Sequence, residues 1–148
     1  MKHKVAGKTL NRNSAHRKAL RMNFANAVFK HERVETTLAK AKALRSFIEK
    51  IITIAKKDDA ASRLHRIRLV ASYLQDKTIV KKLFDEIGPR FKSRPGGYTR
   101  ILRLADHRVG DGTQKAILEL VDNTVLERQI KAAEQAEVVD EVEAGAGA

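Results

Sequence analysis

The residues best suited to bind a ligand in this sequence are basic side chains near the N-terminus. Eight Lys and Arg residues and three His residues precede the first acidic residue, Glu32. Like charges concentrated in this way repel one another unless a polyanion supplies the counter-charge. Arginine can form two parallel hydrogen bonds to phosphate oxygens, lysine acts as a point charge, and asparagine can bond a sugar or base edge. The candidate nucleic-acid contacts in this segment are Lys2, His3, Lys4, Lys8, Asn11, Arg12, His16, Arg17 and Arg21.

A second candidate site is the basic segment at residues 88–100. Basic residues there alternate with small or apolar ones, at Arg90, Lys92, Arg94 and Arg100. The glycines Gly96 and Gly97 allow the backbone to approach a phosphate or sugar closely. Phe91 and Tyr98 could stack on an unpaired base, or they could be core residues beside a basic loop. We favour the core for Phe91, whereas both interpretations stay open for Tyr98, because tyrosine often keeps one end in water.

Patterns typical of enzymes and metal sites are missing from the sequence. The five histidines lack metal-ligand spacing, there is no cysteine, and no glycine-rich stretch has the spacing of a nucleotide-binding P-loop. Asp58 and Asp59 are adjacent, and aspartates at a helix boundary most often cap the helix. We therefore expect no catalytic residue, no cofactor, no metal ion and no small-molecule substrate.

Composition and charge limit the class of protein further. A chain of 148 residues fits one domain, and its net charge is +12 with a sequence pI near 10.2. No apolar run approaches the roughly 20 residues that a transmembrane helix needs, and the first residues lack the apolar stretch of a signal peptide. Together with the missing cysteines, these features predict an intracellular protein without a membrane partner.

The charge is distributed unevenly along the chain. Residues 1–50 contain thirteen Lys and Arg against three acids, whereas residues 101–148 contain five against ten. From Glu134 onward the chain has five acids and no basic residue. Such a segment buries too little apolar surface to offset its ordering entropy, so residues 123–148 are predicted to form a disordered acidic tail.

Apolar residues at helical spacing predict four helices. The first begins at Ala15 with Ser14 as its N-cap and carries basic residues on its exposed side. The second follows Thr37, and its apolar stripe consists of Leu38, Ala41, Leu44, Ile48, Ile51, Ile52 and Ala55. The third follows Asp58 and Asp59, with a stripe made of Leu64, Ile67, Val70, Ala71 and Leu74.

The fourth helix and the strands complete the predicted domain. Asp76 caps a short helix that Gly88 and Pro89 should end. Residues 98–104 and 116–121 have the pattern of strands and are expected to pair antiparallel, while residues 31–37 could be a strand or a loop. These elements predict an α+β fold, a two-layer domain over residues 14–122 in which helices cover a small mixed sheet. A basic, extended arm precedes it at residues 1–13.

Four sequence blocks carry a resemblance to a known family. They are MKHK at 1–4 with LNRNSAHR at 10–17, ETTLAKAK at 35–42, LFDEIGPRF at 83–91 and GGYTRIL at 96–102. In order and spacing they closely resemble the ribosomal protein seventeen family of the bacterial large subunit, over residues 1 to about 122.

The resemblance implies more than the residues do alone. It implies the order helix, strand, three helices and two strands, and hence a true strand near residues 32–37. It also implies a non-catalytic cytoplasmic protein that binds large-subunit (23S) rRNA near the polypeptide exit tunnel, beside other ribosomal proteins and not as a homo-oligomer. The residues that match the RNA contacts of the family are Lys2, His3, Lys4, Asn11, Arg12, His16, Arg17, Arg90, Arg94, Tyr98 and Arg100.

The residues taken without the resemblance leave a rival function open. A DNA-binding protein that compacts the nucleoid, or a nucleic-acid regulator, could use the same charges. Competition by duplex DNA separates the two, because shape and 2′-hydroxyl contacts are lost on B-form DNA.

Overall fold

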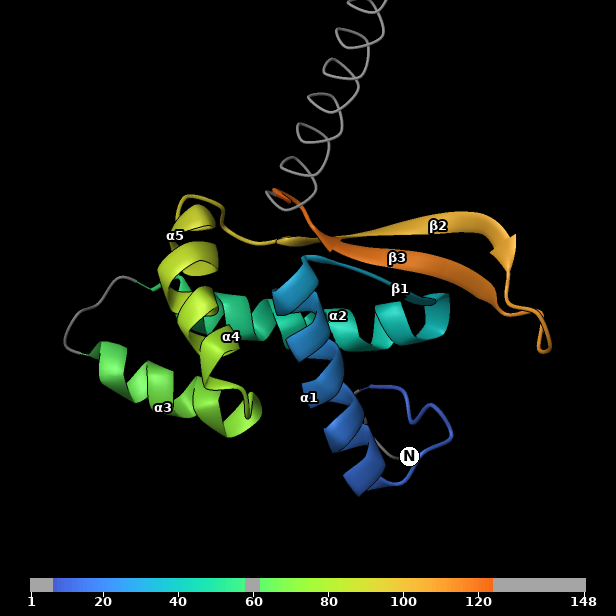
Figure 1. Cartoon of the computed structure of the whole chain (residues 1–148), viewed down its shortest axis with the longest axis horizontal. Coiled ribbons are helices and arrows are strands. Elements are labelled where there is room, and N and C mark those ends of the chain that lie inside the picture. Colours follow the sequence, from blue (N-terminus) through green and yellow to red (C-terminus); the bar gives the residue numbers. More distant parts are fainter. Residues whose placement is uncertain (1–6, 58–61, 124–148) are drawn as a thin grey trace, which may run out of the picture.

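The described part of the chain, residues 7–57 and 62–123 of a computed structural model, has the predicted α+β architecture. The helical elements are α1 (Ser14–His31), α2 (Leu38–Ala55), α3 (Arg63–Tyr73), α4 (Lys77–Lys82), the π-helical turn η2 (Leu83–Ile87) and α5 (Gly88–Arg90). The strands are β1 (Arg33–Thr37), β2 (Thr99–His107) and β3 (Gln114–Leu120). In Figure 1 the sheet lies along one side of α2, and α3, α4 and α5 gather at one end of that helix. The expected order of helix, strand, three helices and two strands is confirmed.

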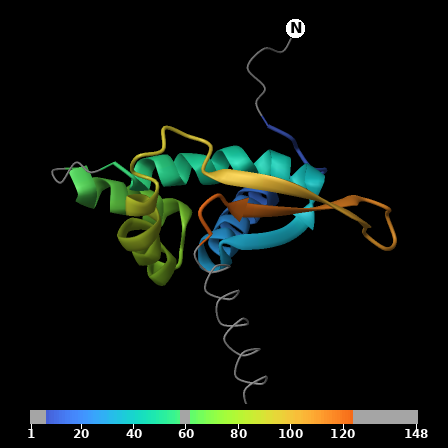
Figure 2. The ribbon, with the colours of Figure 1, turned by 90° about the horizontal axis from the view of Figure 1, so that it is seen from above.

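The sheet has the strand order β1-β3-β2. Both pairs are antiparallel, whereas a mixed sheet was expected. Val34 and Ile101 flank Leu118 on the face that packs into the core, where Leu118 is fully buried. Residues 115–119 of β3 pair with β1, whereas Gln114 pairs only with His107 of β2, so the tip of the β2–β3 hairpin extends past the end of β1 (Figure 2).

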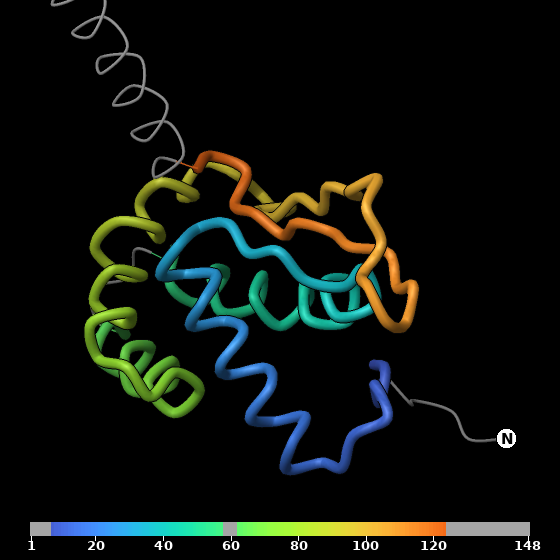
Figure 3. The backbone as a smooth tube through the Cα atoms, turned by 45° about the vertical axis from the view of Figure 1, so that its right-hand side comes forward, coloured from blue at the N-terminus to red at the C-terminus, as the bar shows by residue number. Residues whose placement is uncertain are grey.

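Helix α2 is the centre of the core. It buries Ala41, Leu44, Ile48, Ile51, Ile52 and Ala55. This is the predicted stripe except for Leu38, which is only half-buried. Helix α1 crosses near α2 below the sheet (Figure 3) and contributes Phe24, Ala25, Val28 and Phe29. The apolar spacing therefore identified which sides of these helices face inward.

The chain does not leave its helical path at Gly88 and Pro89, so the predicted end of the fourth helix is wrong. Asp76 caps α4 as expected, and its carboxylate accepts a hydrogen bond from the Thr78 N–H at 2.9 Å. The helical backbone then continues through η2 and α5 to Arg90. Pro89 stands in the first turn of α5, directly after the π-helical turn. A Cβ on Gly88 would lie 3.1 Å from the Ala55 carbonyl oxygen, so the glycine serves the close approach to α2.

The apolar side of helix α3 packs on the core only from Ile67 onward. Val70 and Leu74 are buried and Ile67 is partly buried, but Leu64, expected in the core, is 58% exposed. The N-cap position belongs to Ser62, while Asp58 and Asp59 lie outside the described residues. The buried charge in this region is Arg66, whose Nη2 donates to the Lys57 carbonyl at 2.7 Å.

Candidate nucleic-acid interface

Residues 7–13 turn back against α1 and do not form the extended arm that was expected. Leu10 and Asn11 both have left-handed backbone angles, with φ of 52° and 53°. The Arg12 N–H donates to the Thr9 carbonyl at 3.1 Å, which closes a turn. The Asn13 side chain then caps α1 by accepting from the His16 N–H at 2.8 Å, one residue before the predicted cap. The charged segment therefore has a fixed path next to the first turns of α1 (Figure 3).

This path gathers the predicted contacts at one end of α1. We call the group the α1 cluster, and it consists of Lys8, Asn11, Arg12, His16, Arg17 and Arg21. Arg17 Nη1 donates to the Arg12 carbonyl at 3.2 Å, and a Cβ on Gly7 would lie 3.7 Å from Arg21 Nη2. Arg12 and Arg17 are half-buried, and the other members are exposed. Lys2, His3 and Lys4 lie outside the described residues.

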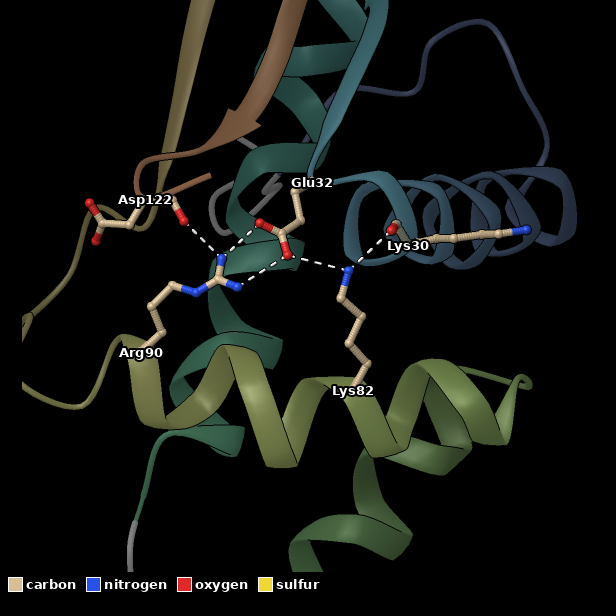
Figure 4. A network of polar contacts seen from close by, with 5 residues as sticks. All are labelled: Lys30, Glu32, Lys82, Arg90 and Asp122. Atoms are coloured by element: carbon tan, nitrogen blue, oxygen red, sulfur yellow. Dashed lines mark hydrogen bonds and ion pairs between the residues drawn. The ribbon is translucent and has the colours of Figure 1, made fainter. Parts of the chain in front are cut away.

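The second predicted segment does not present all of its charges outward. The guanidinium of Arg90 is 15% exposed and binds the fully buried Glu32, with Nη1 2.7 Å from Oε2 and Nη2 3.2 Å from Oε1. Arg90 Nη1 also donates to the Asp122 carbonyl at 2.8 Å. Figure 4 shows that Lys82 approaches the same carboxylate, at 3.3 Å, from the other side. Arg90 is thus engaged inside the fold, where its charge balances Glu32, and its contact with RNA stays a prediction.

Glu32 is ionised in this setting. It ends α1 in a left-handed conformation with φ of 59°. Burial raises the pKa of the Glu32 carboxyl, but the hydrogen bonds and charges of Arg90 and Lys82 outweigh burial and hold the pKa below its usual value. The carboxylate, Arg90 and Lys82 therefore tie the end of α1 to the helix that runs from α4 to α5.

Tyr98, the aromatic residue of the second predicted segment, is buried. Its side chain belongs to the core, with 2% exposure, and its ring lies 5.3 Å from that of Phe91. The Lys56 ammonium lies 5.1 Å from the centre of the Tyr98 ring. A ring covered in this way has a structural role in the core, and stacking of Tyr98 on RNA stays a prediction. Phe91 is fully buried, as favoured from the sequence.

The other basic residues of this segment reach the surface. Arg94 Nη2 lies 3.7 Å from an Asp122 carboxylate oxygen, and Lys92 is exposed. Arg100 is 57% exposed, and its Nε and Nη2 bind Glu119 Oε1 at 2.9 and 2.6 Å. These three side chains remain candidates for contact with a polyanion.

The sheet face turned away from the core carries charges that sequence reasoning missed. We call it the outer face, and it consists of Arg33, Glu35, Thr37, Arg100, Leu102, Lys115, Ile117 and Glu119. Arg33 and Arg100 flank Glu119 from the two edge strands, and Arg33 Nε lies 3.9 Å from Glu119 Oε2. The alternation of Arg33, Val34 and Glu35 was the signal that could have found this face, because strand residues two apart point the same way.

A second feature of the described residues is an apolar cavity. A cavity of about 490 Å³ between α3 and the α4–η2 helix has a mainly aliphatic floor that includes Ile67, Leu74, Val80 and Phe84. Within residues 7–57 and 62–123 no three metal-ligating side chains come together. The helices described there are also too short or too polar to cross a bilayer.

Comparison with known proteins agrees with the resemblance carried by the four sequence blocks. The family model of ribosomal protein L17 matches residues 20–121. A relative from Sulfurihydrogenibium sp. (strain YO3AOP1), the large ribosomal subunit protein bL17, is 49% identical over 122 residues. This alignment covers 82% of the present chain and 98% of the relative. The chain belongs to the ribosomal protein L17 family.

Proposed function

We propose that this protein is a structural constituent of the large ribosomal subunit that binds 23S rRNA near the polypeptide exit tunnel. Membership of the family makes the chain a ribosomal protein, which is a structural and non-enzymatic class. The proposal includes a location in the cytoplasm, beside neighbouring ribosomal proteins and not as a homo-oligomer. The single observation that carries RNA binding is the α1 cluster, in which the fold gathers cations from a segment that has no carboxylate before Glu32.

The α1 cluster is suited to a phosphate backbone rather than to a small ligand. Its charges lie on a turn and on the exposed side of a helix, so they can follow a chain of phosphates. Phosphate contacts fix the position and orientation of the protein on the RNA, and the protein recognises a folded RNA mainly by its shape. The proposed contacts in this part are Lys2, His3, Lys4, Lys8, Asn11, Arg12, His16, Arg17 and Arg21.

The exposed basic residues of the second segment extend the proposed interface. Lys92, Arg94 and Arg100 would meet RNA at the end of the sheet, whereas Arg90 and Tyr98 act inside the fold. The Glu32 contacts keep α1 and the α4–α5 helix in one arrangement, which makes the distances between the two basic regions reproducible. When charged side chains are held in place before binding, less conformational entropy is lost on binding.

Sedimentation on a sucrose gradient tests the proposal. Tagged full-length protein is followed in a lysate, after a high-salt wash and after nuclease treatment. The expected result is comigration with the large subunit that survives the salt wash and is released by nuclease. Migration with chromosomal DNA, or at the top of the gradient, would overturn the ribosomal assignment and favour the DNA-binding rival.

A further inference from the structure

A polar cavity lies where β1 passes directly into α2. Its volume is about 280 Å³, and it is lined by Glu35, Thr36, Thr37, Lys40, Arg108 and Lys115. The lining comes from three parts of the chain, namely the end of β1, the first turn of α2 and the β2–β3 hairpin. None of these residues belongs to the α1 cluster or to the segment at residues 88–100.

The N-terminal end of α2 borders this cavity through Thr37 and Lys40. The first N–H groups of an α-helix have no partner inside the helix and are usually capped by a side chain. Thr37 occupies the N-cap position of this 18-residue helix, but its side chain makes no capping hydrogen bond. The first turn also has no acidic residue. The positive end of the helix dipole is therefore open to an anion.

The side chain of Thr37 also lacks a hydrogen-bonding partner among the described residues. Thr37 is 8% exposed and lines the cavity. Its hydroxyl makes no hydrogen bond with any residue in the described ranges 7–57 and 62–123. Most of this residue is buried, and its hydroxyl, which has no partner in the part of the chain that the structure describes, is left available to a ligand in the cavity.

The charges around the cavity favour an anion as that partner. Lys115 Nζ lies 3.2 Å from Glu35 Oε1, and Arg108 Nε donates to Asp111 at 2.9 Å. Lys40 has no ion pair with the residues that the structure describes, and it is half-buried. Two cations thus share counter-charges with nearby acids, and Lys40 leaves a net positive charge beside the open helix end.

We propose that this cavity binds a phosphate group, and that the phosphate belongs to the backbone of the bound RNA. A phosphate oxygen accepts hydrogen bonds from the amides of the first turn of α2 and from the Thr37 hydroxyl. Lys40 supplies the neutralising charge, and Arg108 and Lys115 border the opening from the hairpin. The assignment of this phosphate to RNA rests on the proposed function, whereas the inference that the cavity binds an anion depends only on the geometry of the cavity.

A titration with inorganic phosphate tests the anion site without RNA. Amide resonances of isotope-labelled full-length protein are recorded against phosphate, with chloride at equal ionic strength as the reference. We expect saturable shifts at Leu38, Ala39 and Lys40 that are lost in Thr37→Val and weakened several-fold in Lys40→Gln. Lys42→Gln is the matched control, because Lys42 is exposed, lies two residues further along α2 and does not line the cavity.

Two results of this titration would overturn the site. One is the absence of a saturable response beyond that of chloride. The other is an equal response in Lys40→Gln and Lys42→Gln. If Thr37→Val fails to fold, as judged by its amide spectrum, the two lysine variants still decide the matter.

The salt dependence of RNA binding tests the source of the phosphate. Affinity for a large-subunit rRNA fragment is measured against salt concentration for the wild type, Lys40→Gln and Lys42→Gln. One lost phosphate contact should reduce the slope of log affinity against log salt by about 0.7–0.9 in Lys40→Gln only. An unchanged slope alongside phosphate binding would assign the cavity to a free anion and overturn its link to RNA. Comigration with the large subunit tests the proposed function separately. The proposed function and the phosphate site can therefore fail independently of each other.

Discussion

Arg90 holds Glu32 through two parallel hydrogen bonds, of 2.7 and 3.2 Å, across 58 residues of sequence. Glu32 ends α1, and Arg90 ends α5. The Glu32 carbonyl also accepts from the Leu120 N–H at 2.9 Å, and Arg90 donates to the Asp122 carbonyl. This one contact therefore links the first helix, the last helical turn and the end of β3.

Replacing Glu32 by glutamine should destabilise the fold strongly. The change leaves the cations of Arg90 and Lys82 without their buried counter-charge, and breaking a buried pair in this way costs roughly 3–5 kcal/mol. We expect a loss of about 3 kcal/mol in the free energy of unfolding, since both cations keep some contact with water. Chemical denaturation measures this loss in the free energy of unfolding. Glu86→Gln, an exposed acid on the same helical path, is the control and should change stability by less than about 0.5 kcal/mol. Equal losses in the two variants would contradict this role of the pair.

The stability that Glu32 provides should depend on pH in a defined direction. Its folded-state pKa lies below the ordinary value of 4.5, so the folded state favours the ionised form. The contribution is therefore fully present above pH 4.5 and is lost as the pH falls through the folded-state pKa below it. The difference in unfolding free energy between wild type and Glu32→Gln should shrink as the pH is lowered below 4.5. A difference that stays constant or grows in acid would refute this assignment.

Removing one arginine from the α1 cluster should weaken RNA binding without unfolding the protein. Arg12→Ala takes away one cation from a turn that is closed by backbone atoms, so the free energy of unfolding should change by less than about 0.5 kcal/mol. The salt slope of RNA affinity should fall by about 0.7–0.9. Arg68→Ala removes an exposed arginine from α3, outside the α1 cluster, and should leave both quantities unchanged. A parallel loss of stability and binding in Arg12→Ala would identify Arg12 as a structural residue.

Two apolar truncations should separate the core from the surface. Ile48 is fully buried in α2, and Ile48→Ala should cost roughly 2–5 kcal/mol of stability. Leu64 occupied an equivalent place in the predicted stripe of α3, but it is 58% exposed, and Leu64→Ala should cost less than about 0.5 kcal/mol. Thermal and chemical unfolding of both variants provide the comparison. Similar losses at the two positions would show that α3 packs differently from the arrangement described.

Local patterns in the sequence were enough to predict most of the elements. The apolar spacing of α2 identified its buried side, and Asp76 identified the start of α4, because helix periodicity and capping depend only on neighbours in the chain. The acid-free N-terminal segment likewise predicted an anion partner, since charge is a property of composition. The strand alternation at Arg33–Thr37 was readable in the same way, although local sequence left open whether it would pair.

Tertiary structure decided which of those side chains are available. Arg90 and Arg100 look alike in sequence, and the fold brings a buried acid to each, but it leaves the Arg90 side chain 15% exposed and that of Arg100 57% exposed. The sequence left open whether Tyr98 stacks on a base or packs in the core, and in the fold Phe91 and Lys56 cover its ring. The cavity at Thr37 exists only because β1 pairs with β3, about 80 residues away along the chain. Sequence thus determined the elements and the total charge. Residues distant in sequence decided which charged side chains are paired inside the fold and which are exposed, because burial and ion pairing depend on contacts that no local pattern encodes.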